Sequence, residues 1–477
     1  MTISMLRVHH DELPPLPVTH GNLLDFPADP LACMRKLQQQ HGSVAALSQD
    51  GAKLYFVFGP ELNHQVLSDS QTFHSRFFAI RGSKNSAQRR LTSGLLSMNG
   101  EEHKRHRRMV MDAFLKKAIQ GYLPAIRLHT EQMLADWQSG KERDISRDMT
   151  EFMLRLTSSI LFGMDNPDLA YRIGRMIDHW VHLNHELGMG AFISSPEISG
   201  RYSELLEFAA ELETQIGELI QQRRTTTGGP DVLSMILQAH DEQGSVGPDQ
   251  LLGQAALIFA AAHLTTAHSL AWTLFLIAQH PSQMAPLHAE LRANLSGGFP
   301  TLEAAERLPV MERIIKESMR VLPASSYSQR ITTQPVQLGP FQLPCAAGVI
   351  FSQFITHHLP ELYPDPEAFQ PERWESLNPS PYAYLPFGAG PRMCIGGPLA
   401  MLILKTVVPT ILQRFKLTSV PYSEVSGKVI STMLSPTCPI QMRIDPQDGT
   451  FEAKPVVGNI HTLVTLTESE RRMRRAA

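Results

Sequence analysis

From residue 101 to residue 290, apolar residues recur mostly at helical spacing. The polar stretches SPEISG and TTTGGPD interrupt this pattern and predict loops between helices. Two further helices are predicted at residues 308–320 and 398–415, the second with Pro398 near its first turn. Short apolar runs, KLYFVFG early in the chain and VQLGPFQLPCAAGVIF at 336–351, predict strands. The pattern therefore indicates a mainly α fold with a minor β part.

One stretch raises the question of a membrane. Residues 255–278, AALIFAAAHLTTAHSLAWTLFLIA, are nearly as long and apolar as a membrane-spanning helix. Histidines, threonines and a serine interrupt the stretch, and no cluster of lysine or arginine flanks it. These features favour a helix buried on all sides in a large protein core over a membrane span.

The composition adds limits to this picture. With 477 residues, of which 43% are hydrophobic, the chain can bury a large core. Its 43 basic and 46 acidic residues give a net charge of -3, which argues against a nucleic acid as partner. The N-terminus has no apolar segment of signal-peptide type, and no linker or repeat divides the chain. We therefore expect a soluble, cytoplasmic protein with a single domain over residues 1–477. Its core should span about 15–445, and residues 446–477 form an extension of unassigned role whose last dozen residues are a frayed tail.

The four cysteines are far apart and include no C-x-x-C pair, which argues against a zinc site, a redox pair or a disulfide framework. One of them, Cys394, stands in FGAGPRMCIG, residues 387–396, just before the helix that begins near Pro398. The start of a helix stabilises an anion. We therefore expect this thiol to ionise more readily than an ordinary one.

Several chemistries suit a cysteine in that loop. A phosphatase-type nucleophile needs an arginine several residues further on, and the following IGGPLAM contains none. A protease-type nucleophile needs a partner that any of the 20 histidines could supply, and a buried structural cysteine is a further alternative. An axial thiolate on haem iron also accounts for the neighbours of Cys394. Glycines let the backbone approach a flat macrocycle, and Arg392 can pair with a propionate.

Residues 387–396 match F-x-x-G-x-R-x-C-x-G at every fixed position, and here the chain resembles the cytochrome P-450 family. The resemblance implies that family's fold, with haem b between a long distal helix and the cysteine loop with its following helix. Cys394 would then ligate the iron, and Phe387, Gly388 and Arg392 would belong to the haem-binding loop.

Glu317 and Arg320 form an E-x-x-R pair, and Arg373 in FQPERW resembles the third member of the family's buried Glu-Arg-Arg cluster. E-x-x-R sequences also begin at Glu102 and at Glu468. The one that begins at Glu317 is distinguished by FQPERW further along the chain. An exposed ion pair would contribute little, whereas removing one member of a buried cluster should cost several kcal/mol.

Other basic residues resemble the family's haem contacts. His103 and Arg107 match the H-x-x-x-R that contacts propionates in bacterial members, and Arg330 stands where another propionate arginine is common. A solvated helix face is the alternative for the first two. Five further basic residues could form a docking patch for an acidic electron donor, or they could be ordinary solvated charges. They are Lys104, Arg105, Arg108, Lys116 and Lys117.

The sequence AAHLTT, residues 261–266, stands where the family has [AG]-G-x-[DE]-T-[TS]. The match implies that Thr265 helps to protonate the reacting oxygen, whereas its structural alternative is a bond back to the carbonyl one turn earlier. Ala262 replaces the usual glycine, and Leu264 replaces the acid that serves in proton delivery. We therefore expect either a substrate whose own polar group completes the relay or an enzyme that releases peroxide. His263, at the variable position, is interpreted as a core histidine.

The resemblance implies a soluble, monomeric monooxygenase of bacterial type that inserts one atom of O2 into a hydrophobic lipid, terpenoid or polyketide-like molecule. No Rossmann or flavodoxin-like segment is found, so electrons should come from a ferredoxin and its reductase, or from a flavodoxin. The alternatives are a peroxide-driven or isomerising enzyme of the same fold and a non-catalytic haem sensor or carrier. The expected substrate pocket comprises Phe77, Phe78, Ile80, Phe192, Ile193, Phe259, Ala262 and residues 324–328.

Overall fold

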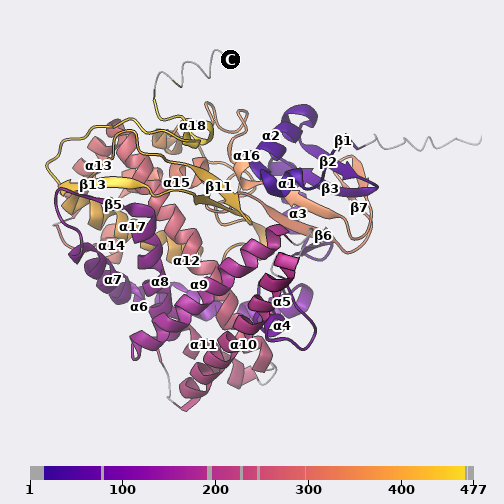
Figure 1. Cartoon of the computed structure of the whole chain (residues 1–477). Helices are drawn as coiled ribbons and strands as arrows, with labels where there is room; N and C mark the ends of the chain where they lie inside the picture. The colour runs from indigo at the N-terminus through magenta and orange to yellow at the C-terminus, as the bar shows by residue number, and fades with distance from the viewer. Residues whose placement is uncertain are drawn as a thin grey trace, which may run out of the picture.

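Helices make up most of the protein (Figure 1). The computed structural model describes residues 16–76, 80–190, 196–225, 229–243, 248–295, 297–467 and 470. Its α-helices are α1 Asp25–Ala28, α2 Pro30–His41, α3 Pro60–Ser68, α4 Ala87–Leu91, α5 Gly100–Met111, α6 Lys116–Gly121, α7 Leu123–Ala135, α8 Ile145–Phe162, α9 Pro167–Gly190, α10 Pro196–Thr225, α11 Val232–Gln243, α12 Pro248–Gln279, α13 Pro281–Asn294, α14 Leu302–Ala305, α15 Pro309–Val321, α16 Gln353–His357, α17 Gly397–Arg414 and α18 Ile460–Leu463. Short 3-10 helices are η1 Asp112–Phe114, η2 Pro371–Glu375 and η3 Gly390–Arg392.

The β part is smaller and consists of separate sheets. Its strands are β1 Val18–His20, β2 Val44–Gln49, β3 Ala52–Val57, β4 Phe73–Ser75, β5 Lys141–Asp144, β6 Ser328–Thr332, β7 Val336–Leu338, β8 Phe341–Leu343, β9 Gly348–Phe351, β10 Phe415–Ser419, β11 Gly427–Ile430, β12 Met433–Pro436 and β13 Gln441–Pro446. A six-stranded sheet has the order β1-β2-β3-β9-β6-β4, and a three-stranded sheet has the order β10-β13-β5. The pairs β7-β8 and β11-β12 are hairpins. In Figure 1 the largest sheet lies beside α1, α2 and α3, away from α10 and α11.

The apolar helix predicted at residues 255–278 is the central part of α12. It packs against α8, α9, α15 and α17. Among the described helices it alone is long and apolar enough to cross a membrane, but 72% of its most apolar window is buried inside the protein. The prediction of a core helix is therefore confirmed, because neighbouring helices rather than lipid cover its apolar surface.

The two helices predicted near residues 308–320 and 398–415 are confirmed as α15 and α17. The prediction for residues 336–351 was only partly correct. β7 and β8 form a hairpin of their own, whereas β9 lies between β3 and β6 in the six-stranded sheet. Local alternation marks each strand but does not reveal which distant strand it pairs with.

The extension from residue 446 packs against the core. Ile460 and Val464 are fully buried, and the backbone N–H of Thr465 donates to the carbonyl of Glu367 at 2.8 Å. The expected tail over the last dozen residues is therefore wrong at its start, since Leu466 is also buried and only 7% exposed. Apolar burial outweighs chain entropy up to this point.

Candidate active site

The loop before α17 is closed by its own backbone. The N–H of Cys394 donates to the carbonyl of Phe387 at 2.8 Å, and the N–H of Gly388 donates to the carbonyl of Leu385 at 3.0 Å. Gly388 and Gly390 have φ angles of 68° and 70°. Glycine adopts this left-handed region without steric cost, so the sequence FGAGPR can fold into a tight loop under the sulfur.

Gly390 also has a neighbour that leaves no room for a side chain. A Cβ atom built there would lie 2.2 Å from the carbonyl oxygen of Leu67, at the end of α3. The loop that carries Cys394 is therefore pressed against α3 by backbone contact.

We expect Gly390→Ala to lower the free energy of unfolding by more than about 2 kcal/mol, because backbone strain and a backbone clash add. Gly42→Ala is the matched control. Its φ angle is 76°, and nothing lies within 4 Å of the added carbon, so it should cost only the strain of about 1 kcal/mol. Urea unfolding of both variants measures the difference, and equal losses would show that contact with Leu67 is unimportant.

The thiol of Cys394 is surrounded by protein atoms, although the residue retains accessible surface. Burial raises the pKa of the thiol, against the lowering effects of the Gly396 N–H, Arg107 and the Gly397 N–H. The prediction that this thiol ionises more readily than usual is therefore wrong for the protein alone, because desolvation outweighs the helix start. A bound metal cation would reverse the balance, since coordination deprotonates a thiol.

One face of α12 has accessible surface, although the helix is otherwise largely buried. Ala261 is exposed and Ile258, Ala262 and Thr265 are half-buried, at the spacing i, i+3, i+4, i+7 of a single helical face. The Thr265 hydroxyl donates to the carbonyl of Ala261 at 3.0 Å. This is the bond to the preceding turn that was the structural alternative to a role in proton transfer. Its oxygen can still accept a hydrogen bond on the open face.

The structure brings four of the predicted cofactor-binding residues together. Burial, then the charges of Arg392, Arg107 and Arg330, lowers the pKa of His103 to about 4. Burial and Arg392 lower the pKa of Arg330 to about 9, and burial and Arg107 lower that of Arg392 to about 10. These groups therefore lie near one another, with His103 and Arg330 buried and Arg107 and Arg392 half-buried.

No carboxylate of the described residues neutralises this cluster. Arg107 donates to the carbonyl of Met393 at 2.8 Å, and Arg330 donates to the carbonyl of Gln329 at 2.9 Å. Arg392 donates to the carbonyls of Leu95 and Met98 at 3.3 and 2.5 Å, and to the Asn99 side chain at 3.0 Å. Buried cations without an anion are costly. The cluster therefore fits an anionic ligand, and the two propionates of a haem have the right charge.

The family model of cytochrome P450 matches residues 12–443 of the chain. The chain belongs to the cytochrome P-450 family. The cyclooctat-9-en-7-ol 5-monooxygenase of Streptomyces melanosporofaciens is 31% identical over 391 residues, 80% of this chain and 84% of that protein. The pentalenene oxygenase of Streptomyces avermitilis is 27% identical over 420 residues, 85% of this chain and 91% of that protein. These similarities establish a P-450 monooxygenase that uses a haem iron.

Solved structures agree on the fold. The cytochrome P450DA heme domain superposes with a TM-score of 0.81 at 24% identity, covering 92% of this chain and 100% of that one. The retinoic acid-bound cyanobacterial CYP120A1 superposes with a TM-score of 0.78, also at 24% identity, covering 91% and 100% of the two chains. The prediction of the P-450 fold is therefore confirmed.

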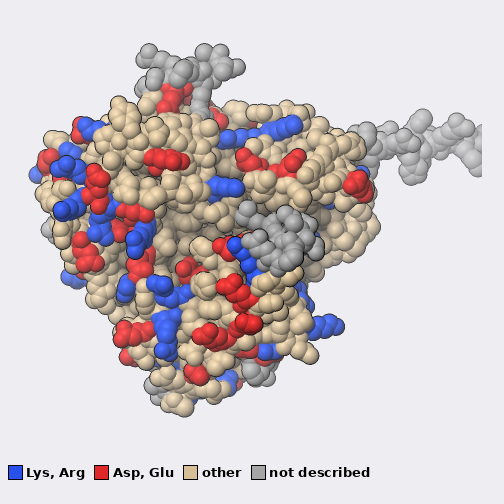
Figure 2. Space-filling view, in the orientation of Figure 1, with Lys and Arg blue, Asp and Glu red and all other residues tan. Residues whose placement is uncertain are grey.

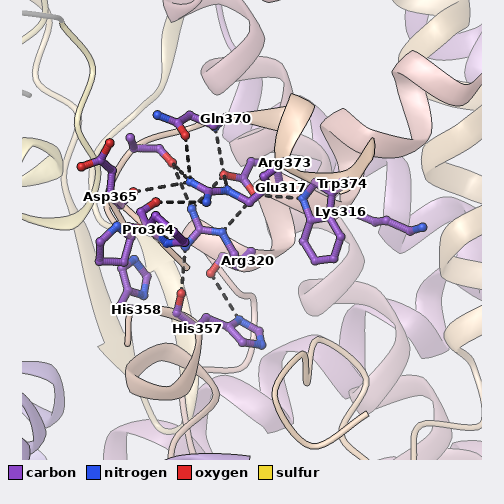
Figure 3. Close-up of polar contacts among 12 residues, drawn as sticks. Lys316, Glu317, Arg320, His357, His358, Pro364, Asp365, Gln370, Arg373 and Trp374 are labelled. Atoms are coloured by element: carbon purple, nitrogen blue, oxygen red, sulfur yellow. Dashed lines mark hydrogen bonds and ion pairs between the residues drawn. The ribbon is translucent and has the colours of Figure 1, made fainter. Parts of the chain in front are cut away.

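The predicted Glu-Arg-Arg cluster of this P-450 is present and buried (Figure 3). Glu317 and Arg320, both 0% exposed, form an ion pair of 2.8 Å within α15, and Arg373 of η2 reaches Glu317 at 2.9 Å. The indole of Trp374 and the N–H of Gln370 also donate to the Glu317 carboxylate, each at 2.9 Å. The prediction that Glu317 and Arg320 form the buried cluster with Arg373 is thus confirmed.

Arg320 joins this cluster to two other segments, the end of α16 and the loop that follows it. It donates to the carbonyls of His357, Pro366 and Ala368 at 2.8, 2.6 and 3.0 Å. These donors bond to backbone oxygens and to no group of the Cys394 loop, so the cluster is expected to act on structure rather than on chemistry.

The predicted substrate pocket is partly corrected. Phe259 does not line it, because its ring is fully buried and stacks on Phe162 with centroids 5.6 Å apart. Ile80 and Ala262 are half-buried and remain pocket candidates. Phe77, Phe78, Phe192 and Ile193 lie outside the described residues.

Charged side chains of both signs alternate over the face in Figure 2, in keeping with the small net charge. Two of the predicted basic residues pair with acids: Lys104 with Glu101 at 2.6 Å and Lys116 with Glu306 at 3.3 Å. Arg105, Arg108 and Lys117 are exposed. Because Arg107 of the same α5 bonds to the carbonyl before Cys394, α5 lies directly against the cysteine loop.

Proposed function

We propose that this P-450 inserts one oxygen atom into a hydrophobic terpenoid. The observation that carries the proposal is the combination of the Cys394 loop with the small-residue face of α12, in a chain whose relatives are named for cyclooctat-9-en-7-ol and pentalenene. Ala261 and Ala262 leave more room beside Thr265 than larger residues would. A bulky, apolar skeleton suits such a space.

Each site residue has a role in the proposal. Haem b, bound through Cys394, supplies the activation of O2, and thiolate donation favours cleavage of the O–O bond. Arg107, Arg330 and Arg392, with His103, hold the propionates. Phe387 and Gly388 shape the loop, and Thr265 passes protons to the reacting oxygen.

We further propose that electrons come from a separate ferredoxin and its reductase, or from a flavodoxin. Exposed basic residues on α5 support a docking site on the cysteine side of the protein. The protein is proposed to act as a cytoplasmic monomer of one domain.

The first test is a binding titration with pentalenene and cyclooctat-9-en-7-ol, followed through the spin-state shift of the haem Soret band. The second supplies ferredoxin, ferredoxin reductase and NADPH and measures O2, NADPH and product. We expect O2 consumption in proportion to an oxygenated terpenoid.

Other outcomes separate the alternatives. Turnover only with added peroxide would indicate a peroxide-driven enzyme, for which Leu264 in place of an acid is the favouring observation. Binding without any turnover would indicate a carrier or sensor, and both results would contradict the proposed function.

A further inference from the structure

His268 is a buried histidine of α12 that no described residue contacts by a hydrogen bond. The residue is 8% exposed, and its Nδ1 atom is buried without a hydrogen-bond partner. Burial, with a further contribution from the charge of His263, lowers its pKa to about 4, so the ring is neutral at physiological pH. Leaving a buried polar atom unpaired costs about 1–3 kcal/mol, so this position calls for a functional explanation.

The position of His268 on α12 places it beside the open face. It follows Thr265 by three residues and Leu264 by four, and side chains at these spacings are neighbours on a helix. Helical side chains incline toward the N-terminus, so the imidazole of His268 is expected to point toward the turn that contains Leu264 and Thr265. A neutral imidazole has one N–H donor and one acceptor nitrogen, which is what a proton-transferring group requires.

A second histidine connects this turn with the outer surface. His263 is 0% exposed, its Nε2 lies 2.9 Å from the Asp178 carboxylate on α9, and its Nδ1 lies 3.3 Å from the Phe259 carbonyl. Both ring nitrogens thus face acceptors, so the doubly protonated ring would be fully hydrogen-bonded. The interpretation of His263 as a core histidine is confirmed by its burial, but its partner gives it a connection to solvent. The Asp178 side chain is 27% exposed.

The charged and titratable groups that act on Asp178 belong to α9 and α12. On α9, the charges of Arg175 and His182 act on Asp178, and the charges of His182 and Asp178 act on His185. Burial raises the pKa of Asp178, but the hydrogen bond from His263, its charge, and the charges of His182 and Arg175 lower it overall. The carboxylate is therefore ionised and can exchange protons with solvent on one side and with His263 on the other.

We propose that Asp178, His263 and His268 form a proton-transfer chain that supplies Thr265 from the surface of α9, with His268 as the member nearest to Thr265. This proton-transfer chain runs along the side of α12 that carries Leu264. Leucine cannot transfer a proton, so the two histidines take the place of the acid that Leu264 replaces. It rests on the monooxygenase activity, in which O2, two electrons and two protons give one oxygen in the product and one in water. Both protons come from solvent, and each histidine returns to its starting state. No direct hydrogen bond joins His263, His268 and Thr265 among the described contacts, so each transfer uses a water molecule or a rotated side chain.

The first experiment does not depend on turnover. The imidazole pKa values of 15N-histidine-labelled holoenzyme are measured by NMR, with His268→Gln used to assign the His268 signal. In the His263→Gln variant we expect the pKa of His268 to rise, because the charge of His263 lowers it in the wild-type protein. An unchanged pKa of His268 would show that the two rings are not coupled and would overturn the proposal.

The second experiment measures coupling with pentalenene or cyclooctat-9-en-7-ol, whichever gives the larger spin-state shift. We expect His268→Gln to lower product per NADPH at least about tenfold, with a matching rise in peroxide, while the dissociation constant and melting temperature stay near the wild-type values. Asp178→Asn is the second variant, for use if His268→Gln folds poorly. It lies at a partly exposed site and should also lower product per NADPH.

His129→Gln is the matched control, since His129 on α7 is also partly buried, with an unpartnered Nδ1 atom. It should leave coupling unchanged. Wild-type coupling in both His268→Gln and Asp178→Asn would overturn the proton chain while leaving the monooxygenase proposal intact. If the wild-type enzyme oxygenates neither terpenoid, the substrate proposal fails, and the NMR experiment still tests the coupling of His263 with His268 that the chain requires.

Discussion

Glu317→Gln is expected to lower the free energy of unfolding by about 3–5 kcal/mol, because it leaves Arg320 and Arg373 buried without their shared anion. Both guanidinium groups lie within 2.9 Å of the carboxylate, and the side chain of Arg373 is only 8% exposed. A neutral amide cannot compensate two cations. Urea unfolding at neutral pH measures the loss.

The pH dependence gives a second readout for the same variant. Burial raises the pKa of Glu317, but Arg320 and Arg373 and the Gln370 N–H outweigh it, so the pKa lies below its ordinary value. A lowered pKa in the folded state contributes stability above the unfolded pKa and loses it as the pH falls through the folded one. The difference between wild type and Glu317→Gln should therefore be full at neutral pH and shrink in acid.

Glu102→Gln is the control, because Glu102 begins another E-x-x-R sequence but is exposed on α5. It should change the unfolding free energy by no more than about 0.5 kcal/mol. Equal losses in the two variants would contradict the role of burial in the Glu317 cluster.

Cys394→Ser is expected to reduce product formation to background, because a serine oxygen donates far less electron density to iron than a thiolate does. The fold should survive, since the loop is closed by backbone bonds, such as that from the Cys394 N–H to the Phe387 carbonyl, which do not involve the sulfur. The melting temperature of the haem-free protein checks this, and turnover with ferredoxin and reductase measures the loss.

Cys345→Ser is the matched control, because Cys345 is an exposed free cysteine in the loop between β8 and β9. It should retain wild-type turnover. Retained turnover in Cys394→Ser, or loss in Cys345→Ser, would contradict the assignment of the iron ligand.

Motifs with fixed local spacing could be predicted from the sequence. The loop at 387–396, the Glu317–Arg320 pair and the apolar α12 each combine a short pattern with one physical requirement, so the residues alone reveal them. Arg373 could be assigned only because FQPERW resembles a known pattern. The Glu317 cluster and the buried α12 were confirmed by the ion pairs and burial in the structure.

Properties that depend on surroundings could not be predicted. The pKa of Cys394 was wrong in direction because desolvation is set by residues distant in sequence. Phe259 was assigned to the pocket because apolarity does not show which face of a buried helix it occupies. His268 was missed, although its spacing from Thr265 was a usable signal, because only the structure shows that it lacks a partner and that His263 bonds to Asp178.

The measurement that most directly tests the account is the absorption spectrum of the reduced protein under carbon monoxide. Thiolate ligation by Cys394 predicts the strongly red-shifted Soret band of a haem-thiolate adduct, and Cys394→Ser should lose that band while Cys345→Ser keeps it. A histidine-type spectrum from the wild-type protein, or a colourless protein after expression with ample haem precursor, would contradict the sulfur–iron bond on which the proposed chemistry depends.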